Sequence, residues 1–159
     1  MEINWIAILL SAISTLLVGF IWYHPKVFGN IWMKETGLTE EQCKTGNMAV
    51  IFGLAVLYAF FISLVLQSLV IHQFGVFGTV GGDANNESFK IFMSEENRNA
   101  FRTFKHGALH GFITGLLLVL PIIGTNSLFE KRSFKYVIVT GGFWIVCFML
   151  MGGIICSMQ

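Results

Sequence analysis

Two histidines in the stretch HGALHGFITG, His106 and His110, are four residues apart, so their imidazoles share one face of a helix. This spacing is typical of helical metal ligands, because two ring nitrogens can then reach one ion. His72 ends an earlier apolar segment, and antiparallel packing of consecutive helices would bring it to the same end. The three imidazoles are candidate ligands for Zn²⁺ or another transition metal, with Glu or Asp of residues 72–105 as a fourth ligand.

The same three side chains also fit functions without a metal. His106 and His110 suit contact with an anionic head group, or a proton relay. Histidines at helix ends also lie in the polar interface, where they hydrogen-bond to water or to loop carbonyls. This last interpretation is the simplest and favours a chain without a bound cofactor. His24, beside Pro25, is interpreted in the same way at the opposite end.

The segments that must position these histidines are long and apolar. Of the 159 residues, 55% are hydrophobic and only 12% are charged, about half the ~25% of a soluble domain. Four stretches without Asp, Glu, Lys or Arg each exceed the roughly 20 residues that cross a bilayer core. The sequence therefore predicts an all-α polytopic membrane protein, one four-helix domain over residues 1–159. We expect spans at about 3–23, 48–71, 106–124 and 136–157, and a long middle loop at 72–105.

Small residues recur every fourth position along three of these spans, which predicts a compact bundle. In lipid, helices associate through close backbone contact and dispersion, and small side chains permit both. The predicted packing residues are Ala7, Ser11, Thr15 and Gly19, then Ala55, Ala59 and Ser63, then Gly107, Gly111 and Gly115. Gln67 and Thr114 continue two of these faces, so we expect them to point inward as polar lining.

The segments outside the spans carry their own signals. KVFGNIWMKE has its apolar residues on one stripe, which predicts a short helix lying in the membrane surface after the first span. The stretch QFGVFGTVGGDANNES is rich in Gly and Asn and is expected to be irregular. After Ser94 we expect a helix that runs without a break into the third span. Pro121 should kink that span or end its regular part.

Basic residues orient the chain in the membrane. Neither tail contains Lys or Arg, whereas the first and third loops carry Lys26, Lys34 and Lys44, and Lys131, Arg132 and Lys135. The positive-inside rule then places both loops in the cytoplasm and both termini outside. The net charge of +1 offers no basic face for nucleic acid, so we expect no such partner.

Two longer stretches, GFIWYHPKVFGNIWMKETGLTEE and TNSLFEKRSFKYVIVTGGFWIVCFMLMGGII, contain distinctive signatures. Their residues are Trp22, Tyr23, Pro25, Phe28, Gly29, Trp32 and Met33, and Leu128, Phe129, Glu130, Arg132, Ser133, Gly142 and Gly152. In both signatures the chain resembles the bacterial membrane protein family catalogued as domain of unknown function 1761. The resemblance implies a four-span integral membrane protein and brings no activity or catalytic residue. We expect ion pairs among Glu130, its basic neighbours and residues Lys26 to Lys34 to join the two signatures.

Three functions remain after the motifs are weighed. The sequence has no HExxH, GxSxG or phosphate-binding loop and no ionisable residue at mid-span. These features favour a non-enzymatic protein of the bacterial inner membrane, surrounded by lipid, that forms a homo-oligomer or joins a larger membrane complex. The first alternative is a small-solute channel or carrier lined by Ser11, Thr15, Ser63, Gln67 and Thr114. The second alternative is a membrane enzyme that binds a metal or haem through His72, His106 and His110.

Overall fold

The four apolar segments of the sequence form four long helices in the computed structural model, which describes residues 2–159. Within this range the chain forms helices and no strand. The candidate spans are α1 (Trp5–Trp22), α4 (Met48–Val70), Phe104–Phe129 and α10 (Phe134–Met158). Each is long and apolar enough to cross a bilayer. The prediction of an all-α fold with four helices that are long and apolar enough to span a membrane is confirmed.

The third span is built from three consecutive pieces. These are α8 (Phe104–Thr114), the π-helical turn η2 (Gly115–Val119) and α9 (Leu120–Phe129). Pro121 has no N–H to donate, and a wider turn lies directly before it, in which the Leu120 N–H bonds to the Gly115 carbonyl. The helix therefore continues past Pro121 to Phe129, beyond the expected end near residue 124.

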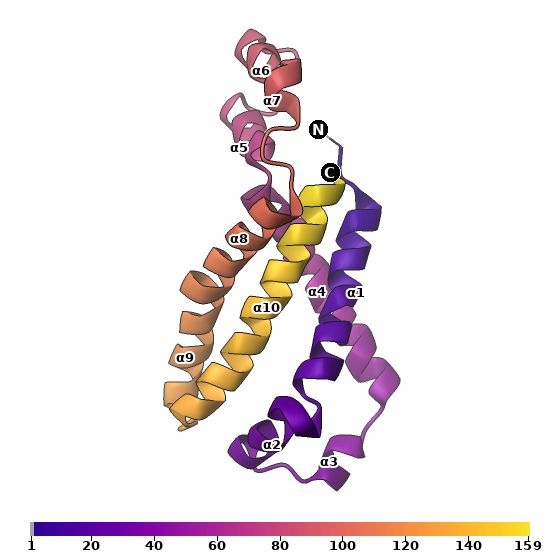
Figure 1. The fold of residues 1–159 in the computed structure, drawn as a ribbon, viewed down its shortest axis with the longest axis vertical. Helices are drawn as coiled ribbons and strands as arrows, with labels where there is room; N and C mark the ends of the chain where they lie inside the picture. The colour runs from indigo at the N-terminus through magenta and orange to yellow at the C-terminus, as the bar shows by residue number, and fades with distance from the viewer. Residues whose placement is uncertain (1) are drawn as a thin grey trace.

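Helix α10 lies in the middle of the bundle and contacts α1, α4, α8 and α9 (Figure 1). Its inward face supplies much of the core, where it meets Ile8 of α1 and Leu66 and Val70 of α4. The core residues of α10 are Cys147, Phe148, Met151, Ile155 and Cys156. Both termini lie at one end of the bundle, together with the start of α8 (Figure 1).

Glycines allow α8 and α10 to approach closely. A Cβ atom built on Gly107 would collide with the Gly152 carbonyl oxygen, and one on Gly111 would collide with the Phe148 carbonyl oxygen. At Gly115 the same atom would lie 2.8 Å from the Cα of Ile145. Backbone therefore packs directly on backbone along this contact, as in other small-residue helix pairs in membranes.

A hydrogen bond between two serines joins α1 to α4. The Ser11 hydroxyl donates to the Ser63 hydroxyl at 2.8 Å, and both side chains are fully buried. Each hydroxyl also contacts a carbonyl of its own helix, Ile8 for Ser11 and Ala59 for Ser63. The hydrogen bond between Ser11 and Ser63 is therefore only one of the polar contacts that these two hydroxyls make.

We expect Ser63→Ala to destabilise the bundle only slightly. Interhelical hydrogen bonds in membrane proteins contribute about 0.6 kcal/mol on average, and the intrahelical bond of Ser11 survives the substitution. Thermal unfolding of single and double alanine variants at Ser11 and Ser63 measures the coupling energy. A loss above about 2 kcal/mol for Ser63→Ala alone would contradict this small contribution.

The chain after α1 forms three short helices at the end of the bundle opposite the termini (Figure 1). They are η1 (Pro25–Gly29), α2 (Asn30–Thr36) and α3 (Glu40–Lys44). The ring of Tyr23 packs against Trp32 of α2 and Phe143 of α10, and the Trp22 indole donates to the Val139 carbonyl at 3.0 Å. Aromatic packing therefore holds η1 and α2 against α10.

The two signature turns are joined, but by other contacts than the expected lysine ion pairs. The Arg132 guanidinium donates to the carbonyls of Glu35 and Thr36, at 3.4 and 3.3 Å. The Ser133 hydroxyl donates to the Glu35 carboxylate. Glu130 contacts Arg132 within its own turn at 3.8 Å. The prediction was wrong because α2 ends with its carbonyls toward Arg132, so backbone acceptors take the place of side-chain charges.

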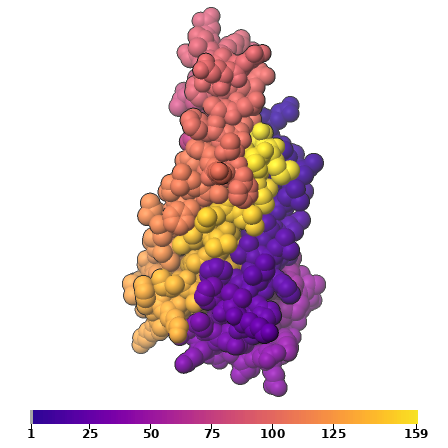
Figure 2. Space-filling model, in the orientation of Figure 1, coloured from indigo at the N-terminus to yellow at the C-terminus, as the bar shows by residue number. Residues whose placement is uncertain are grey.

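The middle segment is more helical than its composition suggests. It forms α5 (His72–Thr79), α6 (Glu87–Phe92) and the single turn α7 (Glu95–Arg98), and the non-helical stretches within it are 80–86, 93–94 and 99–103. Figure 2 shows this segment projecting beyond the rest of the molecule. The predicted continuous helix from Ser94 into the third span was wrong. Phe101 adopts the left-handed conformation, at φ 64°, and the Thr103 hydroxyl caps a new helix by accepting from the His106 N–H.

Candidate metal centre

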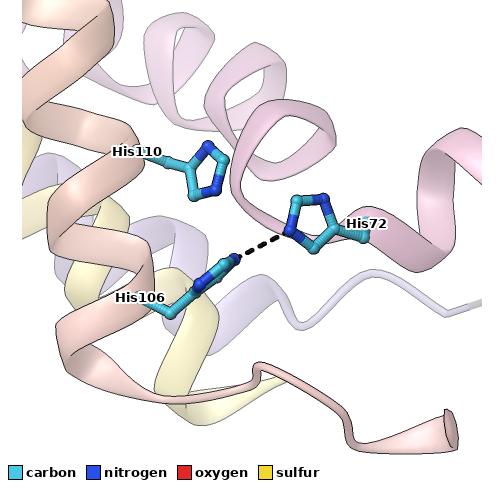
Figure 3. A group of neighbouring side chains, drawn as sticks. All are labelled: His72, His106 and His110. Atoms are coloured by element: carbon cyan, nitrogen blue, oxygen red, sulfur yellow. Dashed lines mark hydrogen bonds between the residues drawn. The ribbon is translucent and has the colours of Figure 1, made fainter.

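Three histidine side chains converge at the end of the bundle that carries the termini (Figure 3). The Nε2 atoms of His72 and His106 are 2.9 Å apart, and His110 faces both rings. One ring nitrogen from each of the three side chains lies within 4.8 Å of the others. We call His72, His106 and His110 the histidine triad. The sequence placed all three histidines at one end of the bundle, and the structure brings their rings into contact.

A sharp bend after α4 carries His72 to the other two histidines. Helix α4 ends at Val70, and Ile71 is extended, with φ −115° and ψ 102°. Ile71 is also buried, so the bend is fixed by core packing. Helix α5 then begins at His72 and projects away from the bundle. On α8, Gly107 packs against α10, which leaves the adjacent His106 on a neighbouring face, toward His72.

The triad is open to solvent on one side. His72 is exposed, whereas His106 and His110 are partly buried. The three rings meet edge to face or tilted, with centroids 4.5 to 5.1 Å apart. The Nε2 atoms of His72 and His106 are in hydrogen-bond contact, so an ion between the rings would take the place of this bond.

Phe101 covers part of the triad, and nothing in the sequence predicts this role. Its ring lies 5.2 Å from that of His106 and 5.9 Å from that of His72, between centroids. The left-handed backbone that places the ring is held by two contacts to its carbonyl, from the Thr103 N–H at 2.8 Å and the Cys156 thiol at 3.3 Å. A non-glycine residue in this conformation is uncommon and is often found at functional sites.

Gln73 fixes the loop that carries Phe101, and it directly follows His72 in the chain. Its side chain is 2% exposed, and its Nε2 lies within 3.3 Å of the carbonyls of Asn97, Arg98 and Ala100. In the sequence, this role is indicated only by the presence of a glutamine, Gln73, within the otherwise largely apolar run VIHQFG. The triad is therefore supported by a buried polar contact from its own backbone neighbour.

The triad geometry fits a small transition-metal ion. Zn²⁺ binds imidazole nitrogens at about 2.0–2.1 Å with tetrahedral angles, which places pairs of ligand nitrogens about 3.3 Å apart. The present spacings, 2.9 Å for one pair and at most 4.8 Å for the group, bracket that value. Ring rotations and small shifts would thus bring all three nitrogens to bonding distance. Among the described residues no carboxylate joins the cluster, so a bound ion would keep a position open to solvent.

The predicted packing and lining residues fall into two groups. One group is buried between helices, and its members are Ala7, Ser11, Ala59, Ser63, Gly107, Gly111 and Gly115. The other group, Thr15, Gly19 and Ala55, lines a lateral crevice beside α1 and α4, and Thr15 is also buried. Gln67 is 4% exposed, and its Oε1 has no hydrogen-bond partner within the described chain. Thr114 donates to the His110 carbonyl at 2.8 Å, one helical turn from the triad.

Comparison with known proteins assigns a family and no activity. A family model described as "Protein of unknown function (DUF1761)" matches residues 6–156, nearly the whole chain. A search of the curated proteins and a search of the solved structures find no match. The matched range includes all four candidate spans almost entirely, together with the histidine triad. The chain therefore belongs to the DUF1761 family.

Proposed function

We propose that this protein binds a divalent transition-metal ion through the histidine triad, at one face of the membrane. The observation that carries the proposal is the convergence of three imidazoles from α5 and α8, with one nitrogen of each within 4.8 Å of the others. Imidazole suits Zn²⁺, Cu²⁺, Ni²⁺ and Fe²⁺. Three histidines with a fourth, solvent-filled position are a known Zn²⁺ arrangement. The close edge-to-face packing of the rings favours an ion over a haem.

Two observations favour metal binding over the alternatives of self-association and solute transport. The glycines that suggested self-association, Gly107 and Gly111, pack against α10 of the same chain. The serines that suggested an aqueous path, Ser11 and Ser63, are fully buried and bonded to each other. Both sets of residues thus have a role inside the bundle. Among the described residues, the only hydrogen bond of the triad side chains is the one between the Nε2 atoms of His72 and His106, at 2.9 Å, and a bound ion would replace it.

The proposed location is the inner membrane, with both termini and the triad outside the cytoplasm. The support is the distribution of Lys and Arg in the first and third loops, at the end opposite the termini. The ion would then be bound from the outer compartment. This placement suits capture of an external metal ion by a protein held in the membrane.

Equilibrium dialysis of the purified chain tests the proposal. We expect one Zn²⁺ or Co²⁺ bound per chain, and Co²⁺ should give the visible absorption bands of a four- or five-coordinate site with nitrogen ligands. The matched control is the chain with all three triad histidines replaced by alanine. Equal metal content in the two proteins, or no bound metal in either, would overturn the proposal.

Metal binding should weaken as the pH falls. The ligand nitrogens must be unprotonated to bind, so protons compete with the ion as the imidazoles become charged. Between about pH 7.5 and pH 5.5 we expect the affinity for Zn²⁺ to fall at least about tenfold. Titration with a zinc indicator at each pH measures the change. An affinity that stays constant over this range would show that the histidines are not the ligands.

A further inference from the structure

A second candidate site lies at the other end of the bundle, far from the triad along the long axis of the molecule. It is a crevice of about 860 Å³, bordered by the last half of α1, the first half of α4, and α10. Its walls are almost entirely apolar, and they include Phe20, Phe52, Phe143 and Trp144. This volume is near the upper end of the ~300–1,000 Å³ range of ligand pockets, so the crevice has room for a long apolar chain.

The crevice follows from the way that α1 and α4 cross. The two helices are bonded at Ser11 and Ser63, and below this crossing they diverge (Figure 1). Where larger side chains would fill the gap, the sequence places Thr15, Gly19 and Ala55. A Cβ atom on Gly19 would still be 3.6 Å from the nearest Phe143 atom, so space remains there. The divergence and the small residues together create the crevice.

Three polar groups mark one end of the crevice. Tyr23 and His24 line it where α1 ends, and Lys26 follows after Pro25. The Nδ1 of His24 accepts from the Lys26 N–H at 3.2 Å, so its Nε2 carries the proton and can donate outward. Within residues 2–159 the Lys26 ammonium is in no ion pair. His24 thus lines this end of the apolar channel as a hydrogen-bond donor, and Lys26, one residue after the lining Pro25, is an exposed cation close by.

We propose that the crevice is a binding site for a phospholipid with an anionic head group. One acyl chain would occupy the apolar channel between α1 and α4, and the phosphate would contact His24 and Lys26. Most of the residues of α1 and α4 that line the crevice belong to the first two candidate spans, so in a membrane the mouth of the crevice would face hydrocarbon. Basic groups at a membrane face attract anionic lipid, which gives the site its head-group preference.

Native mass spectrometry of the full chain, released from vesicles of phosphatidylcholine and phosphatidylglycerol, tests this site. We expect one retained phosphatidylglycerol per wild-type chain. Ala55→Phe places a ring in the space proposed for the acyl chain and should lower retention at least about fivefold. Lys26→Gln should retain phospholipid without the preference for phosphatidylglycerol. The control Leu117→Phe, on an outward position that is 70% exposed, should behave as the wild type.

Several results would overturn the assignment. These are a wild-type chain without retained lipid, equal retention in Ala55→Phe and Leu117→Phe, and a homodimer that Ala55→Phe dissociates. The last result would assign the crevice to a second copy of the chain. Gly19→Leu serves as a second filling variant should Ala55→Phe not fold, because a Cβ there meets only Phe143, at ordinary contact distance.

Discussion

Replacing His106 by alanine is expected to weaken Zn²⁺ binding at least about 100-fold, or about 2.7 kcal/mol. His106 is the central member of the triad, because its ring lies within 4.9 Å of both other rings, between centroids. Its loss leaves two ligands, which do not enclose a tetrahedral ion. Competition with a zinc indicator measures the affinity. His72→Ala and His110→Ala should produce losses of similar size.

His24→Ala is the matched control for this prediction. His24 is the remaining histidine of the chain and lies at the opposite end of the bundle, at the start of η1. Its substitution should leave Zn²⁺ affinity unchanged. The triad variants should keep the melting temperature of the metal-free protein, since the triad rings are at least partly exposed and lie outside the core. A His106 variant that binds Zn²⁺ as tightly as the wild type would exclude the triad as the site.

The sequence predicted the triad members because each signal was local or followed from topology. The four-residue spacing of His106 and His110 places both on one helix face whatever the rest of the chain does. His72 is brought near them by the antiparallel order of consecutive spans, which the lengths of the apolar segments already imply. Distances between the rings required the bend at Ile71, and no residue pattern announces that bend.

The loop between α7 and α8 shows why other parts of the site could not be predicted. The run of polar residues after Ser94 has acceptable helix propensity, so pattern alone favours a continuous helix. In the structure, Gln73 and Cys156, which are distant in sequence, hold the loop carbonyls instead. Tertiary hydrogen bonds thus outweigh local propensity, and they also turn Phe101 onto the triad. Such contacts become visible only in three dimensions.

The small-residue pattern predicted close helices but not their pairing. Identical four-residue spacing occurs on α1, α4 and α8, yet only the α8 glycines meet backbone of α10 directly. Gly107 meets another glycine, Gly152 of α10, whereas Gly111 and Gly115 meet the backbone of Phe148 and Ile145. On α1 and α4 the pattern extends beyond the crossing point, where Thr15 and Ala55 border the crevice. The same four-residue spacing of small residues therefore allows close helix contact on α8 and leaves an open crevice beside α1 and α4.

Gly111→Ala should destabilise the protein by about 3 kcal/mol or more, the upper range for overpacking. The added methyl would overlap the Phe148 carbonyl and approach the Cα of Met149 at 3.0 Å. Both are backbone atoms that cannot rotate away, so α8 and α10 must separate. The whole line of contacts from Gly107 to Gly115 then weakens together. We expect a fall in melting temperature on the order of 10 °C in detergent, measured by circular dichroism.

Gly53→Ala isolates the effect of packing from that of helix propensity. Gly53 lies within α4, and a Cβ there meets no atom within 4 Å. The same substitution should thus be neutral or stabilising by up to about 1 kcal/mol, because alanine is the better helix former. If both variants melt at the wild-type temperature, α8 and α10 do not pack backbone to backbone. If both are destabilised equally, the cost belongs to glycine replacement in general and not to the contact with Phe148. Gly111 directly follows His110 on α8, so a shift of this helix in Gly111→Ala would also move a triad histidine. We therefore expect the affinity for Zn²⁺ to decrease in Gly111→Ala together with the melting temperature.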